Sequence, residues 1–106
     1  MIINGVVWRV RLVSPAHPLL LTPWKTHALG VCDKVTKTIC VDKTLSPQLL
    51  KEVLCHEIVH AFFNESGLQD NSFGIDNSWA RNEEMVDWIA IQGAKIYKAW
   101  QDADAL

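Results

Sequence analysis

The sequence has no long hydrophobic run and no cluster of basic residues, and each absence argues against a class of protein. No stretch reaches the roughly 18 apolar residues that a membrane-spanning helix needs. The apolar N-terminal segment is broken by Arg9 and Arg11, and it lacks the charge order of a secretory signal peptide. The formal net charge is −2, and no patch of lysine and arginine suits a phosphate backbone. We therefore expect a cytoplasmic protein without a membrane or nucleic-acid partner.

Cysteine is scarce, and its spacing does not indicate a disulfide framework. The three cysteines, Cys32, Cys40 and Cys55, are odd in number and form no C-x-x-C pair. Free thiols in a reducing cytosol fit this pattern better. A bridge between Cys32 and Cys40 across a hairpin is the alternative.

Linkers, repeats and low-complexity segments are absent as well, which predicts a single domain over residues 1–106. A chain of 106 residues has the length of one domain. Hydrophobic residues make up 49% of it, enough for one modest core.

Three strands are expected in the first half of the chain. Residues 5–13 alternate, with Arg9 and Arg11 on one face and Trp8, Val10 and Leu12 on the other, which predicts a half-buried strand. Residues 14–27 hold three of the four prolines and are expected to form a loop. Residues 28–32 and 38–42 then read as a hairpin. Together they predict a small antiparallel sheet of about three strands.

Two helices are expected in the second half. The first begins with Ser46 as N-cap and Pro47 as its first residue, and Gly67 is a suitable terminator. The second runs from about residue 79 to 102, with an apolar stripe that continues from Val86 to Trp100. The fold class is therefore α+β, a small sheet packed on two main helices.

The first helix contains the motif H-E-x-x-H, formed by His56, Glu57, Ile58, Val59 and His60. Residues four apart lie on the same face of a helix, so the two imidazoles can reach one metal ion. Two zinc ligands with a glutamate as general base is the chemistry of this motif. The alternative is a pair of histidines on a core-facing stripe, hydrogen-bonded to the backbone.

The second helix offers the carboxylate that a catalytic zinc site needs as its third protein ligand. Glu83 and Asp87 share the face of the apolar stripe, where a carboxylate is costly unless it is paired or bound to metal. Asp87 is placed to hydrogen-bond the far ring nitrogen of a ligand histidine. Glu84 points toward the solvent side. The alternative is an acidic first turn favoured by the helix dipole.

These residues resemble a known family. "HEIVH" followed by "NEEMVD" is similar to the gluzincin pattern, and "EEMVDWIA" resembles the corresponding segment of the ImmA/IrrE-like metallopeptidases of phages and mobile elements. The resemblance implies a minimal zincin fold, with His56, His60 and Glu83 as Zn²⁺ ligands, Glu57 as general base and Asp87 as the partner of His56. Val86 and Asp87 stand where the family has Ala and Asn.

The resemblance implies peptide-bond hydrolysis, with a peptide or protein as substrate, in this family often a repressor-like protein. A free strand edge, residues 28–32 or 38–42, would bind an extended peptide by strand addition. The donor that stabilises the oxyanion stays open among His17, His27, Arg81 and Tyr97. Two alternatives to the metalloprotease are kept: a non-catalytic, zinc-stabilised protein-binding module, and a helical scaffold without metal.

Overall fold

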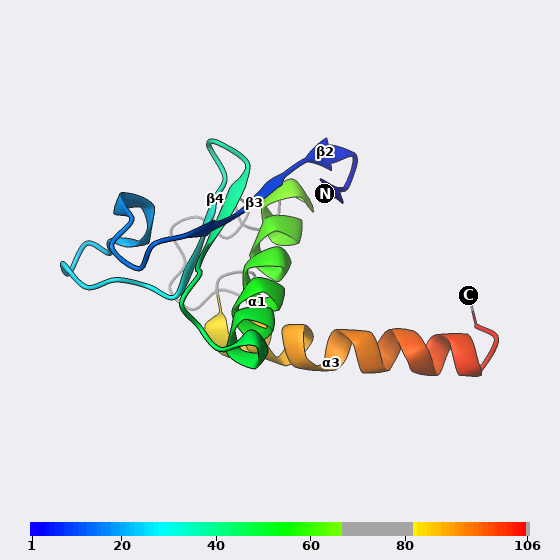
Figure 1. Ribbon diagram of the computed structural model, residues 1–106. Helices are drawn as coiled ribbons and strands as arrows, with labels where there is room; N and C mark the ends of the chain where they lie inside the picture. Colours follow the sequence, from blue (N-terminus) through cyan, green and yellow to red (C-terminus); the bar gives the residue numbers. More distant parts are fainter. Residues whose placement is uncertain (67–81, 106) are drawn as a thin grey trace.

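The computed structural model describes residues 1–66 and 82–105, and they form an α+β fold (Figure 1). A short hairpin comes first, with strands β1 and β2 joined by Asn4 and Gly5, both at positive φ as a two-residue hairpin turn requires. Three longer strands, a short 3-10 helix and two long helices follow. The elements are β1 (Ile2–Ile3), β2 (Val6–Val7), β3 (Arg9–Val13), η1 (Pro18–Leu20), β4 (Gly30–Asp33), β5 (Thr38–Asp42), α1 (Pro47–Ser66) and α3 (Glu83–Asp102).

The main sheet has the order β3-β5-β4 and is mixed, so the expectation of an antiparallel sheet was wrong for one of its two strand pairs. β4 and β5 pair antiparallel as the expected hairpin, whereas β3 and β5 pair parallel. The proline-rich arm after β3 carries the chain past the central position to the far edge. Because the hairpin then returns β5 between β4 and β3, the chain has reversed twice and β5 runs in the direction of β3.

The expected strand over residues 5–13 is interrupted at Trp8, which is buried between β2 and β3. On the face that carries Trp8, Val10 and Leu12, Trp8 is buried, whereas Val10 and Leu12 are 40% and 54% exposed. β3 is an outer strand of the sheet, and α1 packs over the central strand β5 rather than over β3. Alternation therefore does not produce burial where no neighbouring element covers the strand.

Helix α1 packs on one face of the sheet and builds the largest part of the core. Ile39 and Val41 of β5 lie in one buried cluster with Trp8 of the N-terminal segment and Ala61 of α1. Leu20 of η1 contacts the opposite face. The expected start of α1 is confirmed, because Pro47 is its first residue and the Ser46 side chain accepts a hydrogen bond from the Leu49 backbone N–H.

Helix α3 begins at Glu83, after Asn82, whose side chain accepts a hydrogen bond from the Met85 backbone N–H. Val86 packs on Phe63 of α1. The expectation that the stripe is buried as far as Trp100 was wrong, because the second half of α3 extends away from the rest of the described chain and Trp100 is 51% exposed (Figure 1).

Gly67 and residues 79–81 lie outside the described residues. No helix in the described part of the chain is long and apolar enough to cross a membrane.

Candidate metal centre

The two histidines of the H-E-x-x-H motif lie one turn apart on α1 and point to the same place. His56 Nε2 and His60 Nε2 are 3.1 Å apart, and the two rings meet edge to face. Both side chains are partly buried, with 20% and 16% of their surfaces exposed. The spacing of the motif therefore brings two nitrogen lone pairs to one point, as expected for helix positions i and i+4.

Glu83 reaches the same point from the first turn of α3. Its Oε2 is 2.8 Å from His56 Nε2, and its Oε1 is 3.2 Å from His60 Nε2. The ligand atoms of the three residues all lie within 4.8 Å of one another. A tetrahedral zinc ion with bonds of about 2.0–2.1 Å holds two ligand atoms roughly 3.3–3.4 Å apart. With Glu83 Oε2 as the ligand atom, the three separations are 2.8, 3.1 and 3.4 Å, at or somewhat below that value, so two imidazoles and a carboxylate can converge on a single zinc ion with one position left open.

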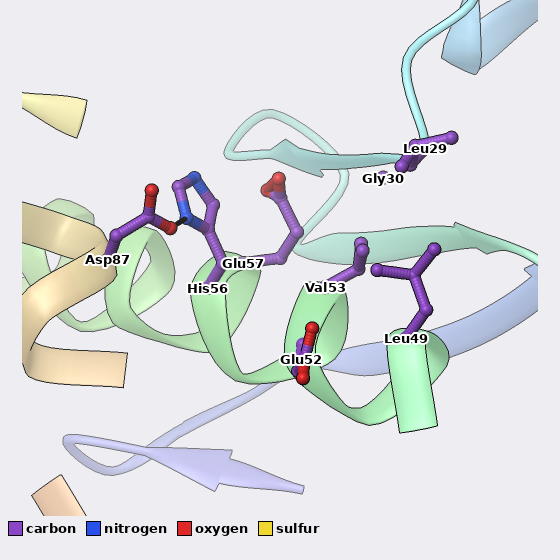
Figure 2. A pocket seen from close by; sticks show the side chains of 8 residues that line it. All are labelled: Leu29, Gly30, Leu49, Glu52, Val53, His56, Glu57 and Asp87. Atoms are coloured by element: carbon purple, nitrogen blue, oxygen red, sulfur yellow. Dashed lines mark hydrogen bonds and ion pairs between the residues drawn. The ribbon is translucent and has the colours of Figure 1, made fainter. Parts of the chain in front are cut away.

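Asp87 lies one turn further along α3 and fixes the orientation of His56. Its Oδ1 is 2.6 Å from His56 Nδ1, so Nδ1 carries the hydrogen and donates it to the carboxylate (Figure 2). The lone pair of a neutral His56 then lies on Nε2, which faces Glu83 Oε2 and His60 Nε2. Acceptor atoms that face one another need a cation or a proton between them. The arrangement therefore suits either a bound metal ion or a proton shared among these atoms.

The environment moves the pKa values of the two histidines in opposite directions. For His56, burial lowers the pKa, but the hydrogen bond that it donates to Asp87 and the charges of Glu57 and Glu83 outweigh this effect, so the net pKa is raised. For His60, burial lowers the pKa and the charge of Glu83 does not fully compensate. A neutral imidazole is the form that ligates metal, and the lowered pKa keeps His60 in that form.

Glu57 follows His56 but points to a different surface of α1. It is 8% exposed, and burial raises its pKa to about 7, with the His56 charge acting against this shift and the Glu83 charge adding to it. A carboxylate with a pKa near neutral is suited to accept and return protons at physiological pH. The aliphatic part of its side chain lies against the backbone of β4 at Gly30.

Two pockets meet at Glu57 and lie along β4. One, of about 330 Å³, is bordered by Leu29, Gly30, Leu49, Val53, His56, Glu57, Asp87 and Glu52 (Figure 2). The other, of about 250 Å³, is bordered by Gly30, Val31 and Cys32 of β4 together with Glu57, His60 and Asn64. Glu57 thus stands in the middle of a groove between α1 and β4, next to the convergent histidines.

The remaining residues considered from the sequence lie away from this groove or outside the described chain. His17 accepts the Leu19 backbone N–H through its Nδ1 as the cap of η1, and His27 is exposed beside it. Tyr97 is exposed ten residues beyond Asp87, about 15 Å along α3. Glu84 is exposed, and Arg81 lies outside the described residues. Among the candidates for the oxyanion donor, His17, His27 and Tyr97 therefore do not border this groove.

The cysteines are free thiols, as expected. Cys32 pairs with Ile39 and Cys40 with Val31, so the two thiols lie on opposite faces of the sheet and cannot form the bridge considered above.

Two residues of the groove were missed from the sequence. At Gly30 the strand β4 lies close against Val53 and Glu57 of α1, and a glycine inside a strand is a known sign of such an approach. Asn64 lies one turn after His60 and donates hydrogen bonds to the His60 carbonyl and the Cys32 sulfur. Nothing in the sequence around Asn64 marked it.

Comparison with known proteins gave no match to a protein family, a curated protein or a solved structure. The chemistry of the site is therefore judged from its own residues.

Proposed function

We propose that the protein is a zinc-dependent metallopeptidase that hydrolyses peptide bonds. The observation that carries this proposal is the convergence of His56, His60 and Glu83 within 4.8 Å, with the buried carboxylate of Glu57 beside them. A structural zinc site is usually closed by four Cys or His ligands, and it has no need of a buried glutamate at its side. The open ligand set and Glu57 together favour catalysis over a purely structural site.

In this proposal one set of residues binds the ion, and Glu57 transfers protons. His56, His60 and Glu83 would hold zinc, which when bound acts as a Lewis acid and makes water a better nucleophile at neutral pH. Asp87 fixes the orientation of the His56 ring, so that its Nε2 lone pair would face the ion. Glu57 takes a proton from water as the oxygen adds to the peptide carbonyl, and delivers it to the departing nitrogen as the C–N bond breaks.

The sheet supports an extended peptide as the substrate. β5 (Thr38–Asp42) has a neighbour on each side, so of the two edges considered from the sequence only β4 (Gly30–Asp33) lies at the margin of the described sheet. The groove along β4 passes Glu57. A peptide that adds to β4 as a further strand would bring one of its carbonyls past Glu57 and the ligand residues.

The test is a zinc measurement and a cleavage screen on one purified sample. We expect one zinc per chain, cleavage of members of a randomised peptide library detected by mass spectrometry, loss of cleavage with a chelator and recovery when zinc is restored. Stoichiometric zinc without any cleavage would favour the zinc-stabilised binding module. A protein that binds no zinc would overturn both.

A further inference from the structure

Gly30 is packed more tightly than any other glycine of the described chain. A Cβ atom built on Gly30 would lie 2.6 Å from Val53 Cγ1 and 3.2 Å from Glu57 Cγ, both on α1. The first distance is one that real side chains do not adopt, so either β4 or Val53 would have to move. The second would push on the side chain of Glu57 itself.

The backbone conformation does not explain why this position is glycine. Gly5 is the glycine with positive φ among the described residues, whereas Gly30 lies in an ordinary strand and pairs with Val41. Any L-residue adopts that conformation, and glycine in a strand lowers stability because it restricts the chain less when unfolded. The requirement at residue 30 is therefore steric and comes from α1.

We propose that Gly30 is a positioning residue, whose missing side chain lets β4 lie directly against Val53 and Glu57 and so holds the Glu57 carboxylate at its place in the groove. Figure 2 shows Val53 and Glu57 pointing from α1 toward the strand at Gly30. The consequence for catalysis rests on the metallopeptidase function proposed above. The consequence for the position of Glu57 does not.

The test compares Gly30→Ala with a double variant and a matched control. The double variant Gly30→Ala/Val53→Ala removes the atom of the closest clash. The control is Gly93→Ala on α3, where an added Cβ has nothing within 4 Å. The first measurement is NMR of the purified proteins at matched metal content, following the Glu57 side-chain carbons and, where Val53 is retained, its methyl groups. We expect these signals to shift in Gly30→Ala, the Glu57 signals to return toward wild type in the double variant, and no shift in the control.

The second measurement is kinetic, on library peptides that the wild-type protein cleaves. Gly30→Ala should keep its zinc and lose about 10²-fold in kcat, in keeping with the cost of a misplaced catalytic group, and the double variant should recover most of the loss. Unshifted Glu57 signals in a folded Gly30→Ala protein would overturn the inference. If the wild type cleaves nothing, the metallopeptidase proposal fails, while the NMR comparison still decides the role of Gly30.

Discussion

The pair Glu83 and Glu84 gives a sharp test of the metal centre, because two adjacent glutamates in one helical turn have opposite expected effects. Glu83 contacts both ligand nitrogens, whereas Glu84 lies in solvent. Glu83→Ala would remove one of the three proposed ligands. Its cost should exceed the 10–100-fold that loss of an outer partner usually causes, so we expect zinc affinity to fall by more than about 100-fold, or about 2.7 kcal/mol.

The other two substitutions calibrate this result. Asp87→Ala leaves the ligands in place but frees the His56 ring, so zinc affinity should fall by about 10–100-fold. Glu84→Ala removes only a favourable charge at the helix N-terminus, worth a few tenths of a kcal/mol, and should change zinc affinity less than about 2-fold.

The assay is zinc dissociation measured by competition with a chromophoric chelator, with circular dichroism to show that each variant is folded. The reasoning requires the order Glu83→Ala, then Asp87→Ala, then Glu84→Ala. If Glu84→Ala loses zinc and Glu83→Ala retains it, the helical phase of α3 in the structure is wrong by one residue, and the candidate centre fails with it.

Two further predictions concern stability. A zinc ion present at 100 times its dissociation constant adds about 2.7 kcal/mol of stability. At about 4–8 °C per kcal/mol for a domain of this size, a chelator should therefore lower the melting temperature by roughly 10–20 °C, and an unchanged melting temperature would argue against the site. In the metal-free protein, burial raises the pKa of Glu57 from 4.5 to about 7, so the stability that its proton contributes is full below pH 4.5 and is lost as the pH rises through 7. Glu57→Gln should therefore stabilise the metal-free protein at about pH 8, by on the order of 1–3 kcal/mol, and little at about pH 4. Urea unfolding at the two pH values measures the difference, and equal effects at both would contradict it.

The candidate site was largely foreseeable from the sequence because its geometry is local to two helices. Helical spacing alone places His56 and His60 on one face. It also turns Glu83 and Glu84, which are adjacent in the sequence, toward different sides of the helix. The structure places Glu83 against both histidines and Asp87 against His56, but the two carboxylate side chains are 65% and 62% exposed, so the expectation that they lie on a core-facing stripe was wrong.

The sheet was less accessible to sequence reasoning, because its features depend on contacts between distant segments. Whether β3 and β5 run parallel depends on the path of the chain between them. The residues within the two strands do not indicate that path. The exposure of Leu12 depends on where α1 lies over the sheet. Gly30 became informative only when β4 and α1 were placed together.

The central claim is that Glu57 is the base of a zinc-dependent hydrolysis, and Glu57→Gln compared with Glu84→Gln tests it most directly. Both changes convert one carboxylate to an amide of equal size, at a buried position in the groove in one case and at an exposed position in the other. With zinc content verified as equal to wild type, Glu57→Gln should lower kcat on a cleaved library peptide by about 10²–10⁴-fold, and Glu84→Gln should leave it unchanged. Wild-type cleavage by a zinc-loaded Glu57→Gln protein would contradict the account.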